Sequence, residues 1–257
     1  MADAQRKGLS PNLYVGTMGW SYSFWKGSFY PTDLPSKDFL SFYAKRFNTV
    51  EADSTFYRIP RIETVTDWKQ KTPKKFLFSL KFPQKITHFK MLQNCQEETR
   101  VFLERASLLG EKLGALLLQF PPMFKQEHMP LIRNYLKTLP KGYHYVVEVR
   151  NKSLLNNELY ALLREHNVAL AWADGAKIPL LPEITADFLY VRWEGDRKTV
   201  MGILGKQEVD RTTQIQQWAD KLKPFLNEGR LVLGYFSKYY SGLPTSDGEE
   251  LCKKVEI

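Results

Sequence analysis

Residues 115–120 read Ala-Leu-Leu-Leu-Gln-Phe, an apolar run that ends at Pro121 and Pro122. Strands that are buried on both faces of a parallel sheet have such continuous apolar runs, and proline ends them. A second run of this kind covers Tyr143–Val149. Between the two lies Met129–Leu139, where apolar residues recur with the period of a helix. This order of strand, helix and strand predicts two parallel strands joined by a helical crossover.

The same alternation continues along the chain in both directions. The predicted strands are Leu13–Gly16, Thr49–Ala52, Phe76–Lys81, Ala115–Phe120, Tyr143–Val149, Val168–Trp172, Phe188–Trp193 and Leu231–Phe236. The predicted helices are Lys37–Phe47, Glu98–Leu113, Met129–Leu139, Glu158–His166, Arg211–Leu226 and a short closing helix, Asp247–Val255. Repeated βα units in 257 residues predict an α/β fold, a single (β/α)8 TIM-type barrel.

Some segments depart from this pattern. Gly175–Thr185 contains Pro179 and Pro182, so we expect a shortened or irregular sixth helix. We expect residues 1–12 to form a disordered or extended tail and residues 13–257 to form one barrel domain. The tail has no apolar signal segment, and no run of roughly 18 apolar residues occurs. The sequence therefore predicts a soluble, cytoplasmic protein outside the membrane.

The charge of the chain is strongly basic, with 37 Lys and Arg against 28 Asp and Glu and a formal net charge of +9. Much of the excess lies between Arg58 and Lys90, where Glu63 and Asp67 are the only acidic residues. Such a segment either contacts an anionic partner such as nucleic acid or serves mainly solubility. Its division between the two ends of the predicted barrel favours solubility.

Polar residues follow the predicted strands, at the end of a parallel barrel where active sites lie. We predict Glu51, Lys81 and Glu148 as catalytic residues, because burial can move the pKa of a carboxylate near a lysine towards neutrality. The predicted substrate-binding residues are Trp20, Tyr22, Asp53, His88, Gln119, Arg150, Asp174, Arg192 and Tyr235. Trp20 and Tyr22 belong to an aromatic cluster that either stacks on a ring or covers the edge of the barrel.

Glu148 and Arg150 stand two residues apart, so along a strand they point to one face and Val147 and Val149 point to the other. This spacing predicts an ion pair aimed into the mouth of the barrel. The alternative is that the inward charges only neutralise one another and close that end.

A metal site is not expected, because the four histidines form no HxH or HxxxH pair and Cys95 and Cys252 lie far apart. We expect both cysteines to be free thiols, and no cofactor is required by the sequence. Residues 194–210 contain three glycines and Lys206 after the seventh strand, where barrels often bind phosphate. The spacing is not that of a P-loop.

Several motifs together make the chain resemble the YecE-like family, a domain of unknown function. These motifs are Gly16-Thr17-Met18-Gly19-Trp20-Ser21-Tyr22, Phe29-Tyr30-Pro31, Val50-Glu51-Ala52-Asp53-Ser54-Thr55-Phe56-Tyr57, Lys81-Phe82-Pro83 with Thr87-His88, Leu118-Gln119-Phe120-Pro121-Pro122-Met123-Phe124, and Glu148-Val149-Arg150. The resemblance spans nearly the whole chain. It implies a TIM-type barrel with a pocket lined by these residues, and it implies no settled activity.

The chain departs from the family pattern at three places. Asp53 stands where the family usually has Asn, and Glu194 stands where it usually has His. Ser237-Lys238-Tyr239 replaces an Asn-Asn-His run after the last strand. Either the pocket is retuned in this protein or these positions never held the core chemistry.

The residues favour an enzyme that uses acid–base or electrostatic catalysis on a small polar or anionic substrate, such as a phosphate or sugar compound. Lys81, Arg150 and Arg192 would bind charge, and Glu51 and Glu148 would transfer protons. Hydrolase, lyase and isomerase chemistry all stay open, as does the oligomeric state. The alternative is a nucleic-acid binding or processing protein with an endonuclease-like barrel.

Overall fold

The computed structural model describes residues 10–175 and 178–255. Its strands are β1 (Leu13–Thr17), β2 (Thr49–Ala52), β3 (Leu77–Lys81), β4 (Leu113–Gln119), β5 (Tyr145–Glu148), β6 (Ala169–Leu170), β7 (Trp172–Gly175), β8 (Leu189–Gly195) and β9 (Val232–Phe236). They form a four-stranded sheet in the order β1-β9-β8-β7 and a five-stranded sheet in the order β2-β3-β4-β5-β6. Neighbouring strands pair in parallel throughout. The predicted α/β class with parallel strands is therefore confirmed.

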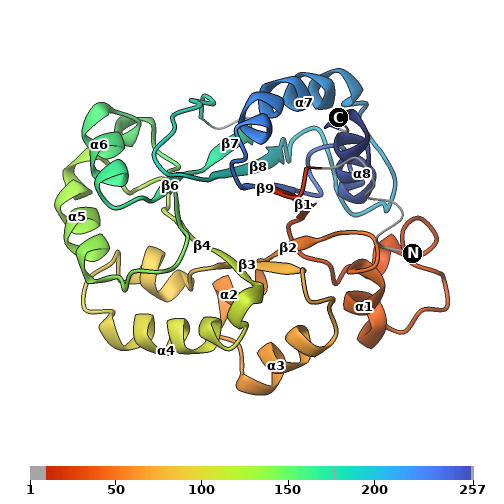
Figure 1. Ribbon diagram of the computed structural model, residues 1–257, viewed down its shortest axis with the longest axis horizontal. Coiled ribbons are helices and arrows are strands. Elements are labelled where there is room, and N and C mark those ends of the chain that lie inside the picture. Colours follow the sequence, from red (N-terminus) through yellow and green to blue (C-terminus); the bar gives the residue numbers. More distant parts are fainter. Residues whose placement is uncertain (1–9, 176–177, 256–257) are drawn as a thin grey trace.

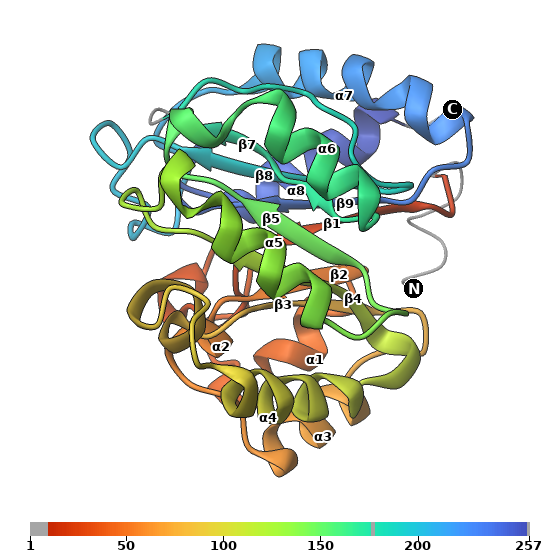
Figure 2. The ribbon, with the colours of Figure 1, turned by 90° about the vertical axis from the view of Figure 1, so that its left-hand side faces the viewer.

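Helices surround these strands, as Figure 1 shows for α3 to α8. The helices are α1 (Phe39–Tyr43), α2 (Ser54–Tyr57), α3 (Ile62–Gln70), α4 (Gln96–Ser107), α5 (Met129–Thr138), α6 (Asn157–Glu165), α7 (Thr212–Asn227) and α8 (Pro244–Val255). Seen from the side, α5 and α6 lie beside each other on the outer side of the strands (Figure 2). Each crossover helix covers the strands that it connects, as expected for βα units.

The two sheets meet at both of their edges. Strands β6 and β7 are separated by Ala171 alone, and the Ala171 amide donates to the Val147 carbonyl at 2.9 Å. At the other edges, β1 and β2 are joined by a parallel bridge between Met18 and Glu51. The Asn48 side chain adds two hydrogen bonds to the β1 backbone there. A chain of hydrogen bonds thus continues from each sheet into the other.

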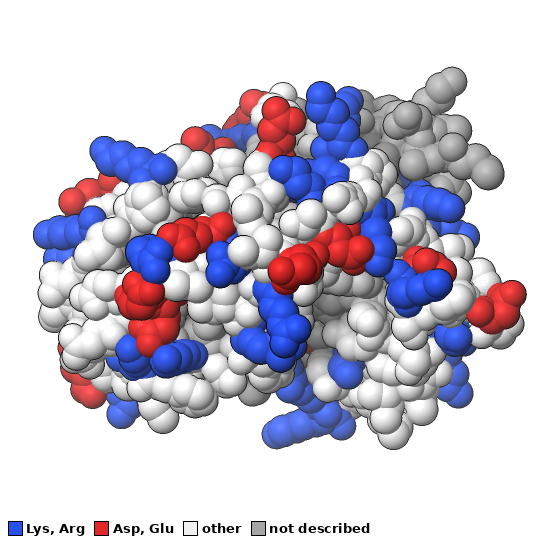
Figure 3. Space-filling view, turned by 90° about the horizontal axis from the view of Figure 1, so that it is seen from below, with Lys and Arg blue, Asp and Glu red and all other residues white. Residues whose placement is uncertain are grey.

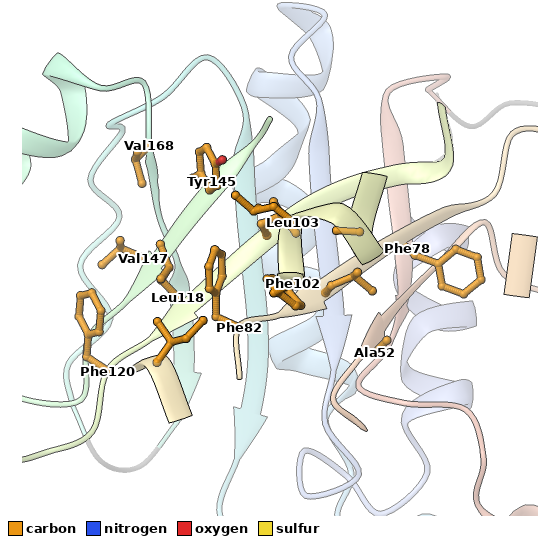
Figure 4. Packing of buried hydrophobic residues seen from close by; sticks show 14 of the residues in the cluster. Ala52, Phe78, Phe82, Phe102, Leu103, Leu118, Phe120, Tyr145, Val147 and Val168 are labelled. Carbon is orange, nitrogen blue, oxygen red and sulfur yellow. The ribbon is translucent and has the colours of Figure 1, made fainter. Parts of the chain in front are cut away.

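Apolar side chains fill both faces of the strands. In β4, Leu116 and Leu118 belong to the large cluster between the strands and the helices, whereas Ala115 and Leu117 belong to a separate cluster among the strands. Figure 4 shows the outer cluster, in which Phe102 packs near side chains of the strands. The continuous apolar run of β4 is therefore explained by burial on both sides.

The structure differs from the predicted elements in three ways. The helix expected over Glu98–Leu113 ends at Ser107, because Gly110 has a φ of 59° and Leu113 begins β4. Helices α2 and α3 and a π-helical turn at Lys85–Phe89 were not predicted. The sixth predicted strand is interrupted, and its second part reaches Gly175.

The predicted irregular connection before β8 contains no helix over residues 178–188, while residues 176 and 177 lie outside the described part. The predicted tail lies mostly outside it too, since the description begins at Ser10. From Ser10 onward the chain is ordered. The Leu13 amide donates to the Ser10 carbonyl, and the Asn12 side chain donates to the Gly229 carbonyl. Among the described helices, none has the length and apolar character needed to span a bilayer.

Candidate functional site

A polar pocket of about 900 Å³ opens where the strands end. The predicted site residues that line it are Tyr22, Asp53, Lys81, His88, Gln119, Arg150 and Arg192. They come from β3, β4 and β8 and from the segments that follow β1, β2, β3 and β5. Parallel strands bring their carboxyl ends to one side, which is why residues far apart in the chain meet here.

The floor of the pocket is built around Arg192, whose side chain is almost fully buried. Its Nε and Nη2 donate to the two carboxylate oxygens of Glu51 at 3.0 and 2.8 Å. The Tyr190 hydroxyl donates to the same carboxylate at 2.6 Å. Burial raises the pKa of Glu51, while Arg192 and Tyr190 favour its charged form.

Arg192 also holds Glu148 at 2.5 Å and contacts Glu194, both through Nη1. Burial acts to lower the pKa of Arg192, but the carboxylates of Glu148, Glu51 and Glu194 outweigh it and hold this pKa well above its ordinary value. The guanidinium therefore keeps its charge, and Glu51 and Glu148 lie beneath the pocket surface, behind Arg192.

Arg150 forms the accessible end of this network. It makes the ion pair with Glu148 that the sequence predicted, and its Nη2 donates to Glu194 at 2.7 Å. Val147 and Val149 pack in the outer cluster, as the spacing predicted. Burial would raise the pKa of Glu194, but Arg192, Arg150 and Lys81 hold it below its ordinary value. The alternative that inward charges only neutralise one another fits Arg192 with Glu51 and Glu148 at the buried end of the network. Arg150, in contrast, reaches the pocket.

Lys81 lies at the end of β3, with its Nζ 4.1 Å from the centre of the Phe56 ring. The Phe56 ring also packs nearly perpendicular to the His88 ring, with 4.9 Å between the ring centres. The Nδ1 of His88 bonds to Thr87 Oγ1 at 2.9 Å. Burial lowers the pKa of Lys81. The carboxylate of Asp53 acts to raise this pKa, and the positive charge of Arg192 acts to lower it. Burial also lowers the pKa of His88, with contributions from Lys81 and Arg150. Both groups are thus drawn towards their neutral forms.

The entrance of the pocket carries further cations. Lys238 Nζ lies 5.4 Å from the Tyr22 ring and 5.2 Å from the Tyr239 ring, and Arg197 lies 4.5 Å from the Tyr239 ring. The charged lining consists of Lys81, Arg150, Arg192, Arg197, Lys198 and Lys238 against Asp53, Glu194 and Asp196. Even with Glu51 and Glu148 beneath the floor, cations exceed carboxylates at this site.

Three predicted substrate-binding residues lie away from the pocket. Trp20 packs edge-on against Trp68 at 5.4 Å, because the loop after β1 turns towards the outer core. Asp174 accepts a hydrogen bond from the Trp218 indole on α7. Tyr235 is fully buried between Thr49 and Ser79, with its hydroxyl 2.8 and 2.7 Å from theirs. For Asp174 and Tyr235, which lie in β7 and β9, the alternation along a strand places the side chain on the outer face or deep in the interior.

Several lining residues were not predicted as ligands. Arg197 and Lys198 lie in the glycine-containing loop after β8, and Lys238 lies after β9. Phe56 and Tyr57 lie in α2, which directly follows β2. All of these residues lie beyond the ends of strands, as residues of such a site should. The sequence prediction covered only the residues closest to each strand end. Among the described residues, no group of three or more His, Cys, Asp or Glu side chains has the arrangement of a metal site.

The basic segment Arg58–Lys90 does not form a continuous positive surface. Lys85 and Lys90 both pair with Glu98, at 2.9 and 2.7 Å. On the face seen from below, which includes α3 and α4, Lys and Arg side chains alternate with Asp and Glu (Figure 3). This pattern is that of a solvated, mixed-charge surface.

Fold and site together define an α/β protein with parallel strands and a polar pocket beyond their carboxyl ends, in which cations slightly outnumber carboxylates. Residues 14–257 match the family described as "Protein of unknown function DUF72". The chain belongs to this family, which confirms the YecE-like resemblance.

Curated relatives match parts of the chain. The UPF0759 protein YecE of Escherichia coli K12 is 34% identical over 139 residues, which are 54% of this chain and 48% of that protein. The UPF0759 protein YunF of Bacillus subtilis is 28% identical over 169 residues, covering 62% of this chain and 58% of that protein. These alignments span about half of the relatives' length.

Two solved structures share the fold over almost their full length. A DUF72 family protein of Thermotoga maritima aligns with a TM-score of 0.74 and 26% identity, covering 94% of this chain and 97% of the other. A DUF72 family protein of Enterococcus faecalis aligns with a TM-score of 0.66 and 23% identity, covering 94% and 95%. The arrangement of strands and helices is therefore common to these proteins.

Proposed function

We propose that residues 13–257 form one domain, a single (β/α)8 barrel in which β6 and β7 are two parts of one strand. The backbone contacts at both junctions between the sheets support this closure. We propose further that the protein is an enzyme that acts on a small anionic substrate in the pocket at the strand ends. Pockets at this end of parallel barrels are the usual place of catalysis.

The excess of cations around the pocket carries this proposal. Lys238 and Arg197 can bind a carboxylate or phosphate, and Arg150 can add donors beyond its Nε and Nη2, which already contact Glu148 and Glu194. Arg192 is held in place by its carboxylates and presents a fixed positive charge at the floor. Preorganised charge of this kind stabilises developing negative charge in a transition state.

Lys81 and His88 are the proton-transferring groups in this proposal. Both line the pocket, and both have lowered pKa values, which favours the neutral form that accepts a proton. Glu51 and Glu148 lie behind Arg192 and serve as positioning residues. Tyr22 and Gln119 are left as polar contacts for the uncharged part of the substrate, and Asp53 is a further carboxylate that can accept a proton.

Nucleic-acid binding has weaker support. Carboxylates on the same surface neutralise part of the basic segment. A groove that tracks a phosphate backbone needs unpaired cations along its length. At the pocket, by contrast, Lys81, Arg197 and Lys238 lie around one cavity.

Thermal melting with a panel of anions tests the proposal, because a ligand that binds only the native state raises Tm. The panel contains inorganic phosphate, sugar phosphates, dicarboxylates, nucleoside monophosphates and a mixed oligonucleotide. We expect a small anion to raise Tm and Arg150→Met to remove most of that increase. Lys71→Met, which removes a surface lysine paired with Asp67, is the control and should leave the increase intact.

Two results would oppose the proposal. If no small anion in the panel changes Tm, the pocket is not an anion site. If the oligonucleotide alone raises Tm and its effect vanishes at physiological salt, the nucleic-acid alternative takes its place.

A further inference from the structure

We propose that Lys81 forms a covalent imine with the carbonyl carbon of a small anionic carbonyl compound, a 2-oxo acid or a phosphorylated aldehyde or ketone. This inference rests on the proposed function and names the substrate class for the same pocket.

Two lysines in the described residues have pKa values lowered mainly by burial, and they differ in their hydrogen bonds. The Nζ of Lys112 donates to the carbonyls of Lys69 and Thr72 at 2.6 and 2.7 Å and lies 3.1 Å from the Thr72 hydroxyl. The amine of Lys112 therefore has three hydrogen-bond partners within the protein. Within the described residues, the Nζ of Lys81 has no hydrogen bond or ion pair, although its side chain lines the pocket.

The surroundings of Lys81 favour a nucleophilic amine. The Phe56 ring covers one side of Nζ at 4.1 Å, and the positive charge of Arg192 lies near it. Lysines that form imines are activated by desolvation or by a neighbouring cation. Desolvation is the larger effect on Lys81, and Arg192 adds to it against the opposing charge of Asp53. A lysine kept only for charge would be expected to meet a carboxylate, as Arg150 and Arg192 do at this site.

The cations of the pocket specify an anionic group on the carbonyl compound. Arg150 on one side and Lys238 and Arg197 at the entrance can hold a carboxylate or a phosphate while the carbonyl carbon faces Lys81. Anchoring the anion converts the amine addition into an intramolecular step.

The chemical step balances without an oxidant or a reductant. The lone pair of neutral Nζ attacks the carbonyl carbon, and the C=O electron pair moves to oxygen, which takes a proton. The resulting carbinolamine loses its hydroxyl group as water while Nζ loses its protons, so that one amine and one carbonyl give one C=N bond and one water molecule. His88 binds Thr87 through Nδ1, which leaves Nε2 to carry these protons. Asp53 lies in the same pocket as a second proton acceptor.

Reductive trapping tests the inference. The whole protein is incubated with glyoxylate, or separately with dihydroxyacetone phosphate, in the presence of cyanoborohydride, and the modified lysine is located by peptide mass spectrometry. We expect labelling of Lys81 to exceed severalfold that of any other lysine, and excess inorganic phosphate to suppress it. The two carbonyl compounds show whether a carboxylate or a phosphate is preferred.

Lys81→Arg should abolish this labelling while keeping a cation, and Lys81→Met is the second variant if the first unfolds. Lys85→Arg is the matched control, because Lys85 follows the same strand but is exposed and paired with Glu98. Uniform labelling of all surface lysines, or equal labelling of the Lys81→Arg protein, would overturn the inference.

Failure of the imine and failure of the proposed function give different results. If small anions raise Tm but neither carbonyl compound is trapped on Lys81, the imine is wrong and the anion site stands. If anions have no effect on Tm and no adduct forms, both are wrong.

Discussion

Arg192 and Arg150 contact the same carboxylates, Glu148 and Glu194, from different depths. Arg192 is 3% exposed and is the guanidinium partner of the fully buried Glu51, whereas Arg150 is 14% exposed. Removing one partner of a buried ion pair leaves a charge without compensation. The depth of each arginine therefore predicts whether its loss affects folding or binding.

We expect Arg192→Met to lower the free energy of unfolding by about 3–5 kcal/mol, because Glu51 loses its partner. Arg150→Met should cost about 1 kcal/mol or less, because Glu148 and Glu194 keep Arg192. Urea unfolding of both variants and the wild type measures the difference. Equal losses would show that the network is one structural unit with no accessible end.

Asp247, in the first turn of α8, gives a pH dependence. Burial raises its pKa to about 7, against the hydrogen bond from Ser241 and the charge of Arg211. The unfolded chain releases this proton near pH 4. Between about pH 4 and 7 the unfolded state therefore binds fewer protons than the folded state, and the free energy of unfolding falls as pH rises.

Asp247→Asn removes this titration and keeps an oxygen that can accept from Ser241. Relative to wild type, the variant should gain about 2–4 kcal/mol of stability between pH 4 and 8. Urea unfolding at several pH values gives both curves. Parallel curves would mean that Asp247 is already ionised in the folded protein at pH 4.

At the level of elements, the junction between β1 and β2 depends on Gly16. A Cβ at this position would lie 2.1 Å from the Thr49 carbonyl oxygen, a backbone atom that cannot rotate away. Gly16→Ala must therefore push the two strands apart where the sheets meet. We expect a loss of about 1–3 kcal/mol on unfolding, as for other overpacked sites.

Gly114→Ala is the comparison for this prediction. Its Cβ would meet side chains of β3 at 3.3 Å and the Phe78 carbonyl at 3.4 Å, so small movements suffice. Thermal melting should show the larger decrease for Gly16→Ala. If both variants melt alike, the close approach of β1 and β2 is not a constraint on stability.

The strands were more predictable than the helices around them, because a strand buried on both faces is apolar at every position. Helix α3 escaped prediction since only Val65 and Trp68 of its residues are buried, within a segment that charge dominates. Helix α2 is too short to show a period. The predicted strand ends located most of the residues that line the pocket. Asp174 faces α7 instead, because its strand continues further than expected.

At the scale of the whole molecule, the identity of the strand-end residues indicated a polar pocket, while their depth could not be derived from sequence. Glu51 and Glu148 share a face with Arg192, and only the three-dimensional distances place them behind it. The cations at the entrance come from loops whose path depends on contacts between distant segments. Gly195, for example, packs so closely on Tyr239 that a Cβ would lie 2.0 Å from its carbonyl oxygen.

The position of β1 between β9 and β2 has a consequence for the order in which a ribosome releases the chain. Strand β1 is translated before the other strands of the fold, but Leu13 pairs with Val232 of β9, which is translated much later. Strands β2 to β6 have their partners within one continuous stretch and can assemble while translation proceeds. The edge of β1 that faces β9 therefore stays unpaired until β9 has been translated, although β2 can contact the other edge earlier.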